Sequence, residues 1–409
     1  MTRTGFKTLY TRFKRTLSRH LLTKKEYWLC FISGLSLVLA YAPFSQWYLA
    51  LFIPAFAFQR IQQQSPKKAA KLMGSFAFGW FASGISWVHV SIDQFGGLPL
   101  AISLSLMLLL CLYLAIFPAL AAYLTARFST KQQLNLWLLP SFWLVGEYLR
   151  SVILTGFPWL SLGYSQIDSP LASFAPLIGE VGLTALIIII NICLVTLFNA
   201  IKLKNRKRII LPTMLIFSLS ILSYVLTKIN WVHVTGETTK VALVQGNIAQ
   251  SIKWAPEQEW PTMLKYLDLT LENFDANIVI WPESAIPAME PAVQDYLKTV
   301  NRSALLNDSS VITGIINYNF ESKEYFNSLI VLGSKHEDDE QGYFYFHSNR
   351  YSKNHLLPIG EFVPFQEWLR PLAPFFNLPM SSFTRGDYVQ KNLIANDIHL
   401  LPLLCFEIA

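Results

Sequence analysis

The segment Trp281-Pro-Glu-Ser-Ala-Ile-Pro287 directly follows the apolar run Asn277-Ile-Val-Ile280, and this junction decides how the last third of the chain folds. A short apolar run of β-branched residues that ends at a proline predicts a buried strand. Polar side chains at the ends of buried strands are where α/β folds build their sites. Glu283 is therefore a candidate functional carboxylate.

Two further segments supply an amine and a thiol. Tyr351-Ser-Lys-Asn-His-Leu-Leu-Pro358 carries Lys353, and Leu403-Leu-Cys-Phe-Glu407 carries Cys405 after the apolar run His399-Leu-Leu-Pro-Leu-Leu404, which predicts another buried strand. A thiol is mostly protonated at neutral pH, so a nucleophilic cysteine needs a base and a stabilising cation nearby. Spacing alone leaves open the alternative of a surface carboxylate, a surface amine and a buried thiol.

The composition of the whole chain indicates a membrane protein. The chain has 409 residues, of which 53% are hydrophobic and 14% are charged, and its mean hydropathy is +0.36. The hydrophobic fraction is higher and the charged fraction lower than in ordinary soluble domains, which predicts an integral membrane protein. Much of the net charge of +7 lies in short basic stretches between apolar segments, so we expect no nucleic-acid binding.

Apolar segments predict a transmembrane domain of about seven helices over residues 27–228. The segments lie near 28–44, 46–61, 72–92, 99–125, 135–150, 170–199 and 209–227. Most of them approach the roughly 20 residues that a spanning helix needs. Residues 1–26 are polar and basic and lack the cleavage site of a secretory signal, so they predict a cytoplasmic tail.

Loop charges predict the orientation in the membrane. The loops at 60–71, 126–134 and 200–208 carry Lys and Arg, whereas those at 42–46 and 93–98 carry neither. Basic loops stay in the cytoplasm. Seven crossings from a cytoplasmic N-terminus place residues 229–409 outside, on the periplasmic face of the inner membrane if the cell is Gram-negative.

The soluble part, residues 229–409, alternates predicted strands with predicted helices. Apolar runs lie at 239–244, 276–280, 310–315, 327–332 and 342–346, and helical stretches lie at 256–274 and 292–306. This alternation predicts an α/β domain. The other cysteines, Cys30, Cys111 and Cys193, lie in apolar segments and are expected to be inert packing residues. No Cys/His spacing indicates a metal site.

Several motifs carry a family resemblance. Those of the soluble part are Val244-Gln-Gly-Asn247, Trp281-Pro-Glu-Ser-Ala-Ile-Pro287, Lys353-Asn-His-Leu-Leu-Pro-Ile-Gly-Glu-Phe-Val-Pro364 and Cys405-Phe-Glu407, and they resemble the nitrilase (carbon–nitrogen hydrolase) superfamily. Those of the membrane part are Ser83-Gly-Ile-Ser-Trp-Val-His-Val-Ser91, Phe95-Gly-Gly-Leu-Pro99, Glu147-Tyr-Leu-Arg150, Thr155-Gly-Phe-Pro-Trp-Leu160 and Gly163-Tyr-Ser-Gln166. They are similar to the apolipoprotein N-acyltransferase family, the membrane branch of that superfamily.

The resemblance implies a fold and roles for the candidate residues. The fold is an α-β-β-α sandwich after a multi-span helical domain, and the site is a Glu-Lys-Cys triad. Cys405 is then the nucleophile, Glu283 the general base and Lys353 the cation that stabilises the oxyanion. Glu361 matches a second glutamate that either pairs with Lys353 or shares in proton transfer. Glu407 matches a residue that supports the thiol.

The resemblance also implies a reaction. A fatty acyl chain passes from a glycerophospholipid, through a Cys405 thioester, to the N-terminal amine of diacylglyceryl-cysteine on a bacterial apolipoprotein, the last step of lipoprotein maturation. The implied partners are the phospholipid donor, the diacylated apolipoprotein acceptor and the bilayer, and no metal or other cofactor is implied. The family's domain continues beyond this cysteine, so the sandwich is expected to be incomplete at the C-terminal end of the sequence.

Two other readings remain open at this point. A membrane-anchored nitrilase-type amidase uses the same triad but passes the acyl group to water. An inactive, truncated remnant keeps the residues without the reaction. Detection of acyl transfer to a lipopeptide amine distinguishes the family's reaction from that of an amidase. For an inactive remnant, replacement of Cys405 is expected to change nothing measurable. Glu147 and Arg150 also allow two readings, an ion pair or a contact with a lipid phosphate.

Overall fold

The computed structural model describes residues 24–94, 96–129, 135–234, 236–334, 342–358, 360–362 and 383–408. Most of the predicted tail 1–26 lies outside these residues. The chain forms two compact units, Met1–His233 and Val234–Ala409. Their division falls close to the boundary at 228/229 that the sequence predicts.

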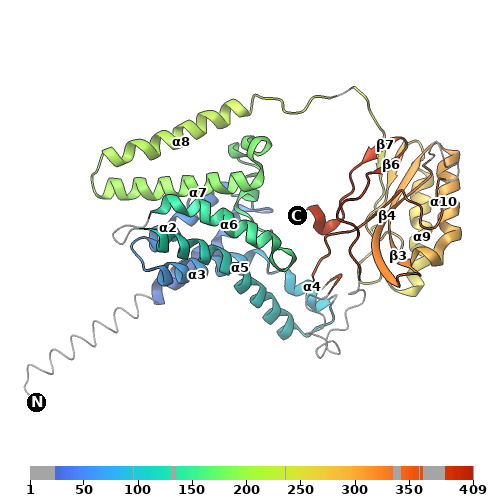
Figure 1. Ribbon diagram of the computed structural model, residues 1–409, viewed down its shortest axis with the longest axis horizontal. Coiled ribbons are helices and arrows are strands. Elements are labelled where there is room, and N and C mark those ends of the chain that lie inside the picture. Colours follow the sequence, from blue (N-terminus) through green and yellow to red (C-terminus); the bar gives the residue numbers. More distant parts are fainter. Residues whose placement is uncertain are drawn as a thin grey trace, which may run out of the picture. The chain divides into compact units, whose positions relative to one another are not determined.

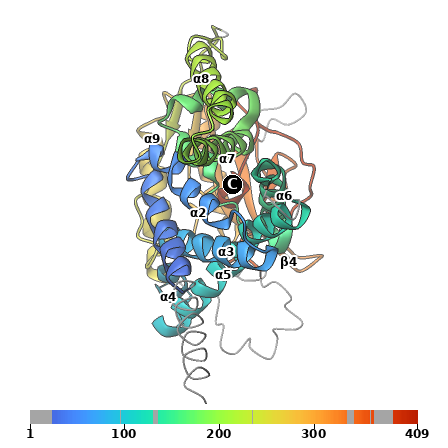
Figure 2. The ribbon, with the colours of Figure 1, turned by 90° about the vertical axis from the view of Figure 1, so that its left-hand side faces the viewer.

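The first unit consists of helices (Figures 1 and 2). Its described helices are residues 24–37, α2 Ile53–Ile61, α3 Pro66–Gly84, α4 Val88–Gln94, α5 Leu100–Phe128, α6 Leu139–Val152, α7 Ala175–Lys202 and α8 Lys207–Leu226. Both views show α3 beside α5, and side chains of these two helices belong to the largest buried cluster of this unit. Pro54 and Pro66 lie in the first turns of α2 and α3, because proline fits the first turn of a helix, where no backbone N–H is required.

Three of the described helices are long and apolar enough to cross a membrane. They are Leu100–Phe128, Pro170–Lys202 and Lys207–Leu226, with 29, 33 and 20 residues. The predicted segment 46–61 is divided into a 3-10 turn, Trp47–Leu51, and the short helix α2, and the predicted segment 72–92 is divided between α3 and α4. The first unit is therefore a membrane domain, and the number of seven crossings stays a prediction.

One buried ion pair stabilises this unit. Arg150 is 1% exposed and pairs with Glu147 on the preceding turn of α6. Its Nη1 also donates to the carbonyl oxygens of Phe157, at 2.8 Å, and Trp159, at 2.7 Å. A charge inside a membrane domain is stable only when it is paired and hydrogen-bonded. Arg150 thus holds the loop after α6, which favours the ion pair over a contact with a lipid phosphate.

The described strands of the second unit form a five-stranded sheet with the order β1-β2-β3-β4-β5. The strands are β1 Val241–Leu243, β2 Ile278–Ile280, β3 Ser310–Asn319, β4 Glu324–Leu332 and β5 Arg350–Ser352. β1, β2 and β3 run parallel, and β3, β4 and β5 run antiparallel. The helices α9 Pro256–Leu271 and α10 Gln294–Leu306 connect the parallel strands, as parallel crossovers require.

Side chains alternate between the two faces of this sheet. Val279 and Val311 pack in the cluster that contains residues of α9 and α10, whereas their neighbours Ile278 and Ile312 pack in a cluster with residues of a separate hairpin. This hairpin consists of β6 Leu393–Ala395 and β7 Ile398–Leu400. Figure 1 shows the helices on one face of the sheet and the hairpin on the other. The predicted α/β domain is confirmed, and the described residues supply the helices, the sheet and a hairpin of the predicted α-β-β-α sandwich.

One predicted strand is wrong, and another is shorter than predicted. Residues 342–346 form no strand, because Gly342 (φ +71°) and Phe346 (φ +65°) have left-handed backbone conformations, and β5 pairs with β4 instead. The run at 399–404 is a strand only as far as Leu400. Pro402, which has no backbone N–H to donate to a ladder, follows that end.

Candidate active site

Glu283 lies in a turn that continues from β2. Trp281, two residues before Glu283, is 1% exposed, and its backbone N–H donates to the carbonyl oxygen of Ile312 on β3 at 2.8 Å. The indole Nε1 donates to Thr270 Oγ1 of α9, also at 2.8 Å. Ser284 then takes a left-handed conformation, with φ +48°. The two hydrogen bonds of the buried Trp281 thus fix the position of the turn that carries the Glu283 carboxylate.

Gly314 on β3 makes room for this turn. A Cβ atom at Gly314 would lie 2.4 Å from the backbone N of Ser284 and 2.7 Å from the Cα of Glu283. Real Cβ atoms do not approach backbone atoms so closely, so any side chain here displaces the turn. The glycine is thus required by a close approach of two backbone segments.

We expect Gly314→Ala to lower acyl transfer by about 100-fold, because a displacement of about 1 Å at a catalytic group has that effect. Overpacking is also expected to destabilise the unit by about 1–3 kcal/mol. Turnover and the thermal unfolding midpoint of the full chain are the measurements. Gly74→Ala is the matched control, because its Cβ would meet no atom closer than 3.4 Å. Wild-type turnover in Gly314→Ala would contradict the prediction.

Lys353 directly follows β5 and is 1% exposed. Its backbone N–H donates to the carbonyl oxygen of Asn327 at 2.8 Å. Its Nζ lies 2.8 Å from Oε2 of Glu361 and 3.5 Å from Oε1 of Glu283. Burial alone would lower the pKa of Lys353, but the two carboxylates outweigh burial and raise it. The amine is therefore a permanent cation between two anions.

Asn327 of β4 holds the two carboxylates together, and the sequence analysis missed it. Its Nδ2 donates to Glu283 Oε1 at 2.7 Å and to Glu361 Oε1 at 2.8 Å. Glu361 also accepts from the backbone N–H of Leu357 at 2.8 Å. Asn327 begins the largely apolar run 327–332, and an amide at the start of such a run is a signal that the sequence does contain, since buried polar groups need partners.

Cys405 begins the 3-10 turn Cys405–Ile408 and has a left-handed backbone, with φ +49°. It is exposed, whereas Cys30, Cys111 and Cys193 are buried, as the sequence predicts for packing residues. Although the residue is exposed, partial burial of its sulfur is the largest cause that raises the pKa of Cys405. The charges of Glu283 and Glu361 raise the pKa further, and Lys353 opposes them. The resting residue is therefore a neutral thiol.

Glu407 connects the cysteine segment to the lysine segment. Its Oε1 accepts from Tyr351 Oη at 2.7 Å and from the backbone N–H groups of Asn354 at 2.8 Å and His355 at 3.1 Å. Its Oε2 accepts from the N–H of Leu404 at 2.9 Å. The Glu407 carboxylate therefore links the residues on either side of Lys353 to Leu404, the residue before Cys405. Through these bonds Glu407 could support the thiol, which is the role that the sequence predicts for it.

A second cation, Lys253, lies at the same turn and was also missed. Its Nζ donates to the backbone carbonyl oxygen of Glu283 at 3.3 Å and lies 5.5 Å from the ring centroid of Trp254. Burial lowers the pKa of Lys253, and Glu283 opposes this shift. The residue follows no apolar run, so strand-end reasoning had no reason to select it.

The structure brings all three predicted triad residues into one cluster within the second unit. Glu283 and Lys353 meet directly, and Cys405 interacts with both. A thiol, a carboxylate that can take its proton and a buried ammonium are the groups that nucleophilic acyl transfer needs.

Two family models match the chain, one for each unit. The model described as "Apolipoprotein N-acyltransferase N-terminal domain" matches residues 33–193, and the model described as "Carbon-nitrogen hydrolase" matches residues 240–407. The second match includes all the residues of the cluster described above.

Curated relatives agree with these matches. The chain is 48% identical over 387 residues to the apolipoprotein N-acyltransferase of Shewanella oneidensis, which covers 93% of this chain and 73% of the relative. It is 46% identical over 404 residues to the protein of the same name from Vibrio vulnificus, covering 98% of this chain and 76% of the relative. A third such protein, from Vibrio parahaemolyticus, is 47% identical over 378 residues, covering 92% and 73%.

Proposed function

The chain belongs to the apolipoprotein N-acyltransferase family, and on that premise we propose that Cys405, Glu283 and Lys353 are its catalytic triad. The enzyme is a membrane acyltransferase of the nitrilase superfamily. The observation that supports the triad is the buried Lys353 ammonium, held between Glu283 and Glu361 and interacting with Cys405. Such a preorganised cation stabilises the charge that develops during acyl transfer.

In the first half-reaction, Cys405 Sγ attacks the ester carbonyl carbon of a phospholipid acyl chain. The thiol proton passes to Glu283 as the S–C bond forms, and Lys353 stabilises the resulting oxyanion. The ester C–O bond then breaks, and Glu283 returns the proton to the departing glycerol oxygen. The products are a lysophospholipid and a Cys405 thioester. Because the resting thiol has a raised pKa, the proton leaves during the attack and not before it.

In the second half-reaction, the amine nitrogen of a diacylglyceryl-cysteine attacks the thioester carbonyl. Glu283 accepts a proton from that nitrogen, the C–S bond breaks, and the thiolate regains the proton from Glu283. The product is an amide, and the enzyme returns to its starting state. A thioester is reactive enough for attack by an amine, which explains why the route proceeds through sulfur.

Glu361 and Asn327 position these groups. Glu361 lies closer to the Lys353 ammonium than Glu283 does, at 2.8 Å against 3.5 Å. We therefore assign to Glu361 the ion pair that orients Lys353 and leave the proton transfer to Glu283, whose charge raises the pKa of the Cys405 thiol more than that of Glu361 does. Asn327 sets the separation of the two carboxylates.

The sequence supports one orientation for the enzyme. We propose that the basic loops 60–71, 126–134 and 200–208 lie in the cytoplasm and that the catalytic unit lies on the periplasmic side of the inner membrane. The helix α8, which is long enough to cross, leads from the last basic loop to the second unit. Donor and acceptor are both anchored in lipid, which keeps them in the same membrane as the enzyme.

Mass spectrometry of the full chain tests the proposal. After incubation with phosphatidylethanolamine, we expect a fatty acyl adduct on the Cys405 peptide that hydroxylamine removes. Addition of a diacylglyceryl-cysteine peptide is expected to discharge the adduct and to increase the mass of the peptide by one acyl group. Loss of the adduct to free fatty acid, without a peptide product, would indicate an amidase.

Two variants control this experiment. Cys405→Ala is expected to give no adduct, and Cys111→Ala, which alters a buried cysteine of α5, is expected to give as much adduct as the wild type. An adduct that persists in Cys405→Ala would assign the nucleophile elsewhere. No adduct in a well-folded wild-type chain would mean that this sequence does not carry out the first half-reaction.

A further inference from the structure

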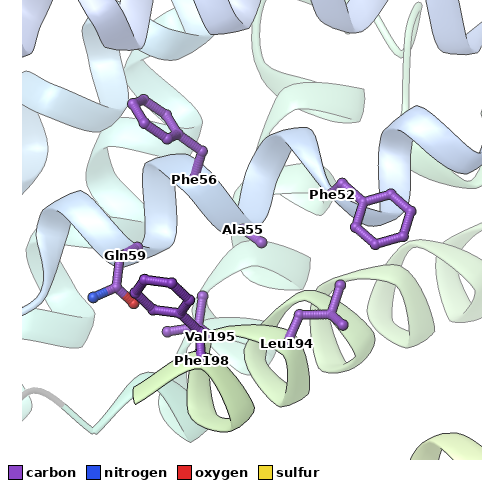
Figure 3. A pocket seen from close by; sticks show the side chains of 7 residues that line it. All are labelled: Phe52, Ala55, Phe56, Gln59, Leu194, Val195 and Phe198. Atoms are coloured by element: carbon purple, nitrogen blue, oxygen red, sulfur yellow. The ribbon is translucent and has the colours of Figure 1, made fainter. Parts of the chain in front are cut away.

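Lys253 is a cation in contact with the proposed triad that no step of the reaction above uses. The groove between α2 and α7 of the first unit, shown in Figure 3, offers no comparable group, because none of its lining residues is charged. Lys253 lies in the second unit, in the loop between β1 and α9. It is therefore the candidate for a further residue that serves acyl transfer.

The sheet topology brings Lys253 to Glu283, although 30 positions separate them in the sequence. β1 and β2 are parallel neighbours, with Leu243 opposite Ile280 in register. The segments that follow two parallel neighbours leave the sheet at the same edge, where α/β folds place their sites. The backbone N–H of Val244 still donates to the carbonyl oxygen of Ile280, at 2.9 Å, so the two segments stay paired up to the turn.

The main-chain carbonyl of Glu283 depends on this lysine. Lys253 Nζ donates to that oxygen at 3.3 Å, and no other group of the residues that the structure describes does so. The turn is tight, because Ser284 has φ +48° and the N–H of Ala285 donates back to the carbonyl oxygen of Pro282 at 3.2 Å. A backbone carbonyl outside a ladder needs a donor from elsewhere. Lys253 therefore holds the main chain at the residue that carries the proposed base.

Lys253 also balances charge. Glu283 and Glu361 bring two carboxylates to the site, and Lys353 brings one ammonium. Lys253 adds a second ammonium, and the charge of Glu283 opposes the lowering of its pKa by burial. A cation that is partly removed from water is stabilised by an anion near it. With a neutral thiol, these four groups carry no net charge.

We propose that Lys253 is a positioning residue for acyl transfer. By holding the main-chain carbonyl of Glu283, it fixes where that carboxylate lies relative to Lys353 and Cys405. Asn327 and Lys353 hold the carboxylate itself, so the main chain and the side chain of one residue are fixed from three different segments. The inference rests on the proposed role of Glu283 as the base and adds to it a residue outside the triad.

Single-turnover acylation of the full chain by phosphatidylethanolamine measures the effect. Lys253→Met is expected to lower the maximal rate of Cys405 acylation by about 100-fold, the effect of a displacement of about 1 Å at a catalytic group. The donor concentration at half-maximal rate is expected to stay unchanged, because the proposed contact is with the protein and not with the donor. Lys253→Arg keeps a charged donor and is expected to recover most of the rate. Lys265→Met, which alters an exposed lysine of α9, is the matched control with no expected effect.

A second measurement shows whether Lys253 acts through Glu283. The groups whose charges shift the pKa of Cys405 are Glu283, Lys353 and Glu361, and Lys253 is not one of them. A displaced Glu283 carboxylate raises that pKa less, so the pH profile of iodoacetamide labelling should move to lower pH in Lys253→Met. Adding Lys253→Met to Glu283→Gln should change neither the labelling profile nor the acylation rate further, because the group that Lys253 positions is already lost.

The outcomes separate this inference from the proposed triad. Losses that multiply in the double variant would overturn the positioning role, since residues that act independently have additive effects on the free energy. A higher half-saturating donor concentration with an unchanged maximal rate would overturn it in favour of a lysine that binds the donor. Wild-type acylation by Lys253→Met beside a slow Glu283→Gln would refute only the role of Lys253. Wild-type acylation by Glu283→Gln would refute the base and, with it, the positioning role.

Unfolding midpoints of the full chain accompany these rates, and all the variants are expected to match the wild type. Should Lys253→Met lower the midpoint, Lys253→Gln carries the same expectations, because its side chain is polar but too short to keep the bond to Glu283.

Discussion

Glu283→Gln is expected to slow acyl transfer by about a thousandfold and, at the same time, to make Cys405 react faster with a small alkylating reagent. The first effect follows because an amide cannot take the thiol proton, and general-base catalysis contributes about 10²–10⁴-fold. The second follows because the carboxylate raises the pKa of Cys405. Its removal lowers that pKa, so more thiolate is present at a given pH.

Lys353→Met is expected to move the thiol in the opposite direction. Lys353 is the group that lowers the pKa of Cys405, so its loss raises the pKa further and slows alkylation. Acyl transfer also falls, by about 10²–10³-fold, because the oxyanion loses its cation. Both variants thus lower turnover, but one raises and the other lowers the rate at which the thiol is alkylated. General unfolding does not produce this pattern.

Rates of iodoacetamide labelling against pH measure this difference. The wild-type rate should rise only above the ordinary range of a thiol, because its pKa is raised. The curve of Glu283→Gln should shift to lower pH and that of Lys353→Met to higher pH. Cys405→Ala gives the background of the buried cysteines, and Glu272→Gln, an exposed carboxylate, is the matched control. Slower labelling of Glu283→Gln than of the wild type would contradict the assignment of Glu283.

Arg350→Met is expected to destabilise the second unit by about 3–5 kcal/mol, because it leaves Glu290 charged, buried and without its cation. Glu290 is fully buried, and each of its carboxylate oxygens lies 3.0 Å from a guanidinium nitrogen of Arg350. Tyr343 Oη, at 2.8 Å, and Asn317 Nδ2, at 2.6 Å, complete its shell. Arg350 begins β5, the strand that leads to Lys353.

A double-mutant cycle identifies the cause. Adding Glu290→Gln to Arg350→Met removes the unpaired charge, so the double variant is expected to be more stable than Arg350→Met alone. Apparent unfolding midpoints of the full chain are the measurement. Lys298→Met is the matched control and is expected to leave the midpoint unchanged, since its pair with Asp295 is exposed and 3.8 Å long. An Arg350→Met variant as stable as the wild type would show that the carboxylate finds another partner or a proton.

The residue types of the active site could be predicted because each carries its chemistry in its own side chain. A thiol, an amine and a carboxylate in motif segments already indicate acyl transfer, and the apolar segments already indicate a membrane. Strand-end reasoning predicted the position of Glu283 just beyond a strand, since β2 ends at Ile280 and the turn follows at once. It misplaced Cys405, because β7 ends at Leu400 and pairs with β6 outside the main sheet.

The sequence by itself determined the two-part architecture and supplied the candidate reacting groups, because hydropathy and functional-group chemistry are properties of single residues and short windows. Only the tertiary structure decided how those groups are held. Asn327, Lys253 and Gly314 all contact the turn at Glu283, and all three are distant from it in the sequence. Such contacts depend on strand order and on close backbone approach, which no local pattern specifies.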